Sequence, residues 1–444
     1  TEPHDFEPST KNVATISDAD MFVYMDDSME TWVKKVKKSI NSDNLTIVRA
    51  SGDMLLMAGT AEEEGEDHDE HEGHSHEYDP HVWLSAKRAV TLVENIRDTF
   101  VAKYPDKADT FKANSAAYIE KLNDLDKAYT DGLSNAKQKS FVTQHAAFGY
   151  LALDYGLNQI SIAGISPEVE PSAKRIASLT KYVKKYDIKY IYFEENASSK
   201  VAATLADEAG VKTKVLNPLE SLTNKQIKAG EDYFSVMKEN LKALKLTTDV
   251  KGKEIKAETD DTKTVQHGYF KDKDVTDRKL SDWTGKWQSA YPYLLDGTLD
   301  PVWAYKAKAS KGEQTAQEVK DYYTKGYQTD VEQIIIDGKK NKVTFVQNGE
   351  KHTYTYKYVG YKILKYEKGN RGVRYLFETD DKDAGEFKYI QFSDHNITST
   401  DVEHFHLFWG NSSQDEILKE MEHWPTYFPA KESGQEIAQH LVAH

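Results

Sequence analysis

The pattern of apolar residues changes once along the chain, and this change limits the possible folds more than any other feature. In residues 1–245, short apolar runs such as Met21–Tyr24 and Tyr190–Phe193 alternate with helical patterns. This alternation is typical of parallel sheets covered by helices. After residue 263, strand patterns rich in aromatic and β-branched residues follow one another directly, which is typical of an antiparallel barrel or sandwich. The sequence therefore predicts two domains of different fold classes.

The first domain, residues 1–245, is predicted to have two α/β halves, at about 1–105 and 137–245. Between them an apolar stripe runs through residues 106–136, which predicts one helix of about 40 Å. The polar, charged residues 246–266 are predicted to form a linker. The second domain, 267–444, has helical patterns at 316–325 and 414–421 and six strand patterns, at 331–336, 342–346, 353–366, 372–378, 387–393 and 404–409.

Composition excludes several classes of protein. The 444 residues include no cysteine, so disulfide scaffolds, cysteine zinc fingers and thiol catalysis are excluded. The formal net charge of −15 argues against nucleic-acid binding, because phosphate recognition needs clustered Lys and Arg. No run of about 18 apolar residues is present, so no membrane span is predicted. Any transition-metal site must therefore use His, Asp and Glu.

Histidines are few in the first domain. Outside one acidic stretch they are His4, His81 and His145, each in a loop context beside a predicted helix or strand end. Loops at the carboxyl ends of strands converge in open α/β sheets. Three neutral imidazoles and one carboxylate make a tetrahedral zinc site. The pattern leaves the carboxylate open, and a surface or core role for each histidine remains the alternative.

A second group of histidines lies near the end of the chain. His404 and His406 are two apart on a predicted strand, so their side chains leave the same face, and His395 ends the preceding strand pattern. Three histidines on adjoining strands suggest a metal site, with incidental histidines on an aromatic strand as the alternative. The remaining histidines are interpreted as structural or solvent-exposed: His267, His352, His423, His440 and His444.

Residues 61–79 contain four histidines among ten carboxylates and are predicted to form a disordered loop. Such a charge run is usually only solvated. Here the histidines favour weak, multidentate collection of zinc beside the first site; they are His68, His71, His74 and His76.

Five segments of the first domain resemble those of the zinc-specific solute-binding proteins of ABC transporters: TEPHDFEPST, DPHVWLS, SFVTQHAAFGY, YIYFEEN and LNPLESL. The resemblance implies two α/β lobes joined by a rigid helix and a His-rich loop where residues 61–79 stand. It implies zinc ligation by His4, His81 and His145, with Glu220 as the carboxylate. Related manganese importers have a glutamate at the position of His145, so an imidazole there favours zinc.

The second domain is similar to the ZinT family of zinc-binding, lipocalin-like barrels, through segments such as KYIQFSDH, EHFHLFWG and EMEHWPTYFP. This resemblance implies a zinc site at His395, His404 and His406. Together the domains resemble the AdcA-type zinc lipoproteins of Gram-positive bacteria. The expected protein is a non-enzymatic monomer with two Zn²⁺ sites, tethered by a lipid to the outer face of the cell membrane, that delivers zinc to a membrane ABC permease.

In that family a strand–helix–strand segment and a lipidated cysteine precede the TEPHDFEP stretch, and neither precedes Thr1 in this sequence. The N-terminal segment of the first domain is therefore expected to be missing, and membrane attachment is an expectation from the resemblance alone.

Three other functions compete with zinc delivery. A zinc hydrolase could use the second group of histidines, because three ligands leave a fourth position open, although no H-E-x-x-H motif is present. An adhesin could use zinc only to support its folding. A manganese importer would bind the competing metal at the first site.

Overall fold

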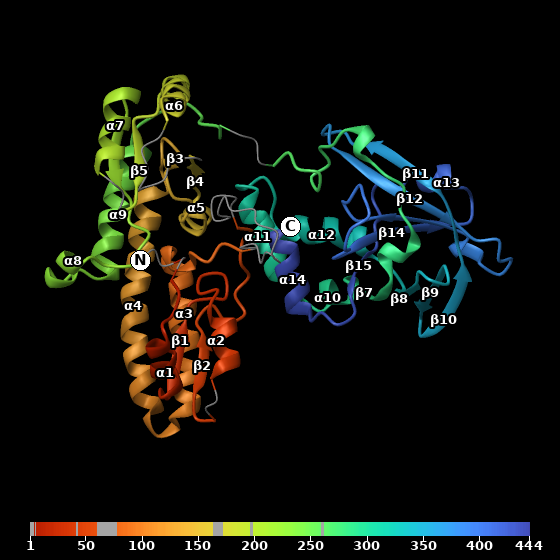
Figure 1. Cartoon of the computed structure of the whole chain (residues 1–444), viewed down its shortest axis with the longest axis horizontal. Coiled ribbons are helices and arrows are strands. Elements are labelled where there is room, and N and C mark those ends of the chain that lie inside the picture. The colour runs from red at the N-terminus through yellow and green to blue at the C-terminus, as the bar shows by residue number, and fades with distance from the viewer. Residues whose placement is uncertain are drawn as a thin grey trace. The chain divides into compact units, whose positions relative to one another are not determined.

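The structure is a computed structural model that describes residues 4, 6–40, 43–59, 78–162, 172–195, 199–258 and 262–444. The chain divides into two units, Thr1–Glu258 with Ala443–His444 and Thr259–Val442, and Figure 1 labels most of their elements. No helix in the described ranges combines the length and the apolar composition that crossing a bilayer requires.

The first unit contains two parallel sheets. Strands β1 (Met21–Tyr24) and β2 (Thr46–Arg49) form one, and β3 (Ser140–Thr143), β4 (Asn158–Ser161), β5 (Tyr190–Phe193) and β6 (Lys212–Val215) form the other in the order β4-β3-β5-β6. The helical segments are α1 (Thr10–Ser17), α2 (Val33–Ser39), η1 (Val82–Leu84), α3 (Ala86–Lys103), η2 (Pro105–Lys107), α4 (Ala108–Leu133), α5 (Gly149–Tyr155), α6 (Ala173–Tyr186), α7 (Ser199–Ala209), α8 (Asn224–Lys228) and α9 (Tyr233–Thr248). The α/β class expected for this part of the chain is confirmed.

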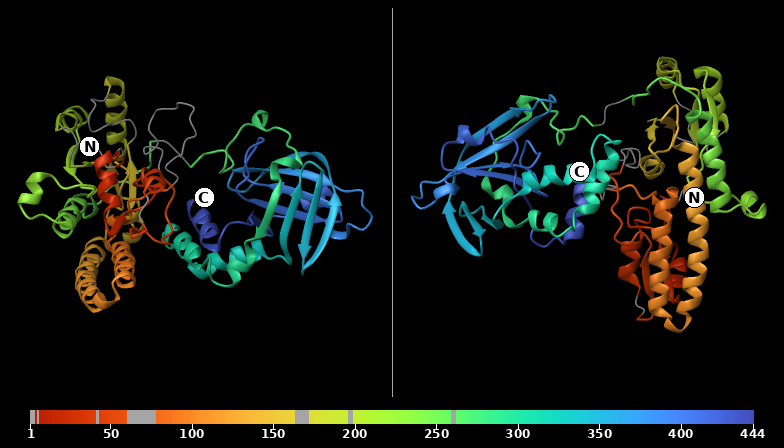
Figure 2. Two further views of the ribbon diagram at one scale, coloured as in Figure 1. Left: turned by 60° about the horizontal axis from the view of Figure 1, so that its bottom comes forward. Right: turned by 180° about the vertical axis from the view of Figure 1, so that it is seen from behind.

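The long helix predicted over residues 106–136 is α4, which runs for 26 residues beside α3 (Figures 1 and 2). Pro105 separates the two helices, since proline cannot continue the hydrogen-bond ladder of a helix. One face of α4 is buried, with Leu122, Leu125 and Tyr129 each at most 2% exposed. Helix α4 therefore packs along the first unit through the predicted apolar stripe.

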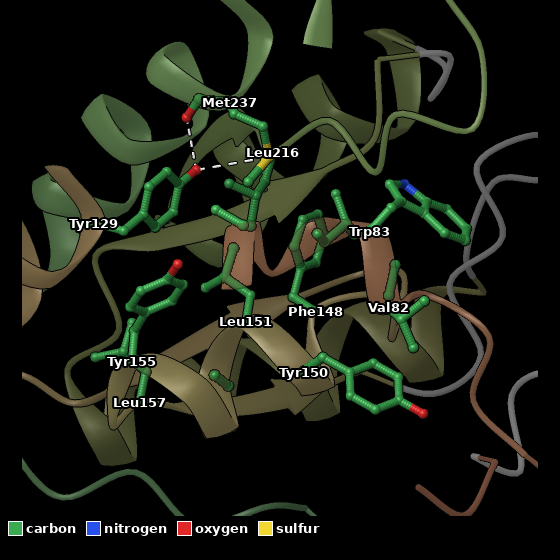
Figure 3. Packing of buried hydrophobic residues seen from close by; sticks show 14 of the residues in the cluster. Val82, Trp83, Tyr129, Phe148, Tyr150, Leu151, Tyr155, Leu157, Leu216 and Met237 are labelled. Carbon is green, nitrogen blue, oxygen red and sulfur yellow. Dashed lines mark hydrogen bonds between the residues drawn. The ribbon is translucent and has the colours of Figure 1, made fainter. Parts of the chain in front are cut away.

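The centre of this unit is a cluster of aromatic and aliphatic side chains (Figure 3). Within it the buried hydroxyl of Tyr129 donates to the carbonyl of Met237, with 2.6 Å between the oxygens. Tyr129 lies on α4 and Met237 on α9, so this hydrogen bond joins the connecting helix to the last helix of the unit.

Part of the segment predicted to be a linker packs on the first unit. Helix α9 continues to Thr248, and the buried Ile255 contributes to a core cluster of the same unit. The Tyr182 hydroxyl donates to the carbonyl of Lys256 at 2.7 Å. The chain therefore remains attached to the first unit up to the residues before 259.

The second unit contains one antiparallel sheet with the strand order β10-β9-β8-β7-β15-β14-β13-β12-β11. Its strands are β7 (Gly285–Ser289), β8 (Val331–Asp337), β9 (Lys342–Gln347), β10 (Glu350–Thr355), β11 (Lys357–Lys365), β12 (Arg371–Glu378), β13 (Tyr389–Ser393), β14 (Phe405–Gly410) and β15 (Thr426–Pro429). Helical segments are η3 (Asp272–Asp274), η4 (Leu280–Trp283), α10 (Tyr291–Leu295), α11 (Asp300–Ala309), α12 (Ala316–Tyr327), η5 (Gly385–Phe387), α13 (Gln414–Ile417) and α14 (Gly434–Ala443).

The single strand predicted over residues 353–366 is wrong. The structure breaks it at Tyr356, whose buried ring points inward and whose hydroxyl donates to the carbonyl of Phe387. Strands β10 and β11, on either side of this one residue, are the two opposite edges of the sheet. The sheet must therefore curl so that β10 and β11 approach each other at Tyr356, and Figure 2 shows the curled sheet. This half-barrel confirms the predicted lipocalin-like class.

We expect Tyr129→Phe to destabilise the first unit by about 1–2 kcal/mol, because it removes a buried hydrogen bond without changing the ring packing. Tyr118→Phe is the matched control, since Tyr118 lies on the same helix but is 41% exposed, and it should change stability by less than about 0.5 kcal/mol. Calorimetry of the metal-free chain measures both. Equal melting temperatures for the two variants would contradict the prediction.

Candidate metal sites

Three histidines and one glutamate of the first unit converge on one point: His4, His81, His145 and Glu220. The Nε2 atom of each histidine lies 3.1–3.2 Å from Oε1 of Glu220. Nε2 of His4 also lies 3.2 Å from Nε2 of His81. Donors bound 2.0–2.1 Å from a tetrahedral zinc ion lie about 3.3 Å apart. The four atoms therefore have the spacing of ligands around one small cation.

The sheet positions His145. This residue follows β3, a central strand of the four-stranded sheet, at the carboxyl edge where ligands of open α/β sheets bind. The backbone N–H of Gln144 donates to the carbonyl of Tyr192 at 2.8 Å, which continues the pairing of β3 with β5. The side chain of Gln159 donates to the carbonyl of His145 at 3.1 Å. Neighbouring strands thus fix the loop that carries this ligand.

Glu220 lies on a strained loop after β6. The preceding residue, Leu219, has a φ of 55°, which is costly for a side chain of this kind. Its N–H donates to the Asn217 side chain at 2.8 Å, and the buried side chain of Asn240 bonds both backbone groups of Asn217. The Trp83 indole donates to the carbonyl of Pro218 at 2.8 Å. This network holds Glu220 toward the segment that contains His81.

A carboxylate orients His81. The Nδ1 atom of this fully buried ring lies 2.7 Å from Oδ1 of Asp79, which also accepts the backbone N–H of His81. A carboxylate oxygen only accepts, so the ring carries its proton on Nδ1. Nε2 of the neutral ring then presents a lone pair to Glu220 Oε1 at 3.1 Å. Two acceptors this close repel each other unless a cation or a proton lies between them.

A proton is the alternative to a metal ion at this position. Burial alone lowers the pKa of His145, but the hydrogen bond and charge of Glu220 outweigh it and raise the pKa above its ordinary value. Burial likewise raises the pKa of Glu220, but the hydrogen bonds from the three histidines outweigh it and hold that pKa well below its usual range. A proton therefore competes with a metal for this site.

The second unit brings together His395, His404 and His406, as the sequence pattern suggested. Nε2 of His395 lies 3.2 Å from Nε2 of His406. The hydroxyl of Thr426 donates to a carbonyl and so accepts the Nδ1–H of His406 at 2.8 Å. His395 hydrogen-bonds to the backbone of Gln266. The Thr426 contact leaves the Nε2 lone pair of His406 facing Nε2 of His395.

A buried ion pair supports the turn that carries His395. This residue has a φ of 63°, in the left-handed region. The preceding Asp394 accepts the N–H of Asn396 and the guanidinium of the fully buried Arg278, the latter at 2.7 Å. Burial lowers the pKa of His395, with Asp394 opposing this in part. His395 therefore stays neutral at a lower pH than His145 does.

Among the other histidines, His267, His423 and His444 are exposed and His352 is partly buried. His68, His71, His74 and His76 lie outside the described residues. His440 contacts His404, which the sequence pattern missed because the two residues are 36 positions apart.

Two family descriptions match the chain: "Zinc-uptake complex component A periplasmic" over residues 1–246 and "ZinT (YodA) periplasmic lipocalin-like zinc-recruitment" over residues 261–444. The zinc-binding protein AdcA of Streptococcus pyogenes serotype M1 is 66% identical over 453 aligned residues, covering 100% of this chain and 88% of that protein. The zinc-binding lipoprotein AdcA of Streptococcus pneumoniae is 62% identical, with the same coverage. The crystal structure of Zn(II)-bound AdcA from Streptococcus pneumoniae is similar with a TM-score of 0.87 and 60% identity, covering 100% of this chain and 93% of that one.

We expect Asp79→Ala to weaken zinc binding at the first site about 10- to 100-fold, because His81 loses the acceptor that fixes its tautomer. Asp18→Ala is the control, since Asp18 is exposed in the same unit. Competition with a chromophoric chelator measures the affinity. Equal affinities for the two variants would show that Asp79 does not orient the ligand.

Acidification should release zinc from the first site before the barrel site. Zinc binds neutral imidazole. Because the pKa of His145 is raised and that of His395 is lowered, protons displace zinc from the first site at a higher pH than from the barrel site. For each proton that zinc must displace, the zinc affinity falls about tenfold per pH unit below the pKa of that histidine. Zinc titrations between pH 7.5 and 5.5 test this order. The His406→Ala variant keeps the first site, and the His145→Ala variant keeps the barrel site. Earlier loss from the barrel site would contradict it.

Proposed function

Because this chain belongs to the AdcA family of zinc-binding proteins, with a zinc-uptake component A domain followed by a ZinT domain, we propose that it captures zinc outside the cytoplasm for a membrane ABC importer. One observation carries the proposal. The lone pair of His81 faces the carboxylate of Glu220 at 3.1 Å, which is an arrangement that requires a cation or a proton.

The first site is proposed to be the transport site. Four protein donors fill a tetrahedral coordination shell, so a captured ion keeps no reactive water. Three imidazoles and one carboxylate also favour zinc over manganese, which prefers oxygen donors. Glu220 is only 5% exposed at its side chain, so the ion would be shielded from competing ligands.

The barrel site is proposed to gather zinc when the metal is scarce. Because the two sites belong to one chain, a zinc ion released by one would meet the other at a raised effective concentration. Residues 61–79, which precede His81 in the sequence, would add weak ligands for the same purpose.

A binding role, and not hydrolysis, is proposed for the barrel site. The carboxylate adjacent in sequence, Glu403, is 69% exposed and lies 3.8 Å from His440. A general base must instead reach the proton that it removes. Relatives named as lipoproteins support a lipid tether to the outer face of the membrane, and we propose that the chain acts there as a monomer.

We expect Glu220→Gln to reduce zinc uptake to the level of cells that lack the protein, because the closed site loses its anionic donor. His406→Ala should leave uptake unchanged in zinc-rich medium and slow it only when a chelator limits zinc. Uptake of radioactive zinc by a deletion strain that carries each variant measures both effects.

Glu239→Gln serves as the control, since Glu239 is exposed on α9. Normal uptake by the Glu220→Gln strain would reject the transport role of the first site. Loss of uptake in His406→Ala cells even in zinc-rich medium would reject the auxiliary role of the barrel.

A further inference from the structure

His440 lies on α14 and contacts Nδ1 of His404, a histidine of the barrel site. Its Nε2 atom lies 3.2 Å from Nδ1 of His404, and the two ring planes meet at 76°. His440 is not a member of the group whose donor atoms share one centre, which consists of His395, His404 and His406. Its place is therefore beside a ligand rather than among the ligands.

We propose that His440 is a positioning residue for the barrel site, an inference that rests on the zinc-binding role proposed above. A neutral imidazole that binds zinc through one nitrogen carries its proton on the other. Nδ1–H of His404 donates to Nε2 of His440, which leaves the Nε2 lone pair of His404 for the metal. The contact fixes both the tautomer and the ring orientation, as outer partners of metal-bound histidines do.

Helix α14 holds His440 in place. The side chains and backbones of Ser433 and Glu436 cap its start reciprocally. Gly434 allows close packing there, because a Cβ atom would lie 2.8 Å from the ring of Tyr293. Ile437 and Leu441 are buried on the inner face. The acceptor nitrogen is thus presented by a fixed helix.

The ring of His404 is also confined from a second side. Phe428, on β15, stacks on it with centroids 5.3 Å apart and planes 17° apart. The same phenyl ring meets His440 edge-on, with centroids 5.3 Å apart. His404 is only 5% exposed, so water has little access to replace the lost acceptor. Without His440, stacking would keep the ring plane but not the tautomer.

The three barrel histidines take their outer partners from different parts of the chain. His406 uses Thr426 on β15, and His395 uses the backbone of Gln266. His404 depends on the C-terminal helix. Zinc binding in the barrel is therefore coupled to the docking of α14.

The test uses the full chain with His145→Ala as the parent, so that zinc binding reports the barrel site. In this background, His440→Phe keeps the ring packing but removes the acceptor, and we expect zinc affinity to fall about 10- to 100-fold. His440→Gln restores an acceptor oxygen and should stay within about threefold of the parent. His352→Phe, the same change on β10, is the matched control and should bind as the parent does.

Nitrogen-15 NMR of the histidine rings separates positioning from a purely structural role. We expect the metal-free parent to hold His404 in the Nδ1–H form and His440→Phe to populate both tautomers. Equal affinity of His440→Phe and parent would overturn the proposal, as would equal losses in the Phe and Gln variants or a zinc-bound shift at His440 itself. A parent that binds no zinc would instead overturn the proposed barrel site.

Discussion

The metal sites depend on one electrostatic constraint: acceptor atoms held face to face at distances that only a cation or a proton stabilises. In the first unit Asp79 fixes the proton of His81 on the far nitrogen, so the near nitrogen meets Glu220 as a lone pair. The residues around each site must be held rigidly, because the two acceptor atoms would otherwise move apart. Both sites accordingly contain a residue with left-handed backbone, Leu219 or His395. The N–H of Leu219 donates to the Asn217 side chain, and the N–H of Asn396, which follows His395, donates to Asp394.

The ligands of the two sites differ in charge. The first gathers three imidazoles around a carboxylate, so it attracts protons as well as metal, and the pKa of His145 is raised. The barrel site has imidazoles whose outer partners include a hydroxyl and a backbone group, and burial lowers the pKa of His395. A chain with both arrangements can hold zinc over a wider range of conditions than either site alone.

Secondary structure followed the sequence wherever local signals were strong. Strands β1 and β5 have the predicted bounds. The prediction failed over residues 353–366, because alternation continues through Tyr356 while the tertiary curl of the sheet breaks the strand there. Strands β7 (GKWQS) and β15 (TYFP) were missed because, unlike β1 (MFVY) and β5 (YIYF), they are not continuous apolar runs.

The sequence by itself determined the chemistry that was available. Without cysteine, the donors had to be imidazoles and carboxylates, and the change of apolar period required two domains of different classes. Only the tertiary structure decided which atoms meet. Pattern alone could not select Glu220, 216 residues from His4, nor find His440 behind His404. The local periodicity of the sequence predicts on which face of a strand or helix a side chain lies. Contacts between distant residues depend instead on how loops and helices pack.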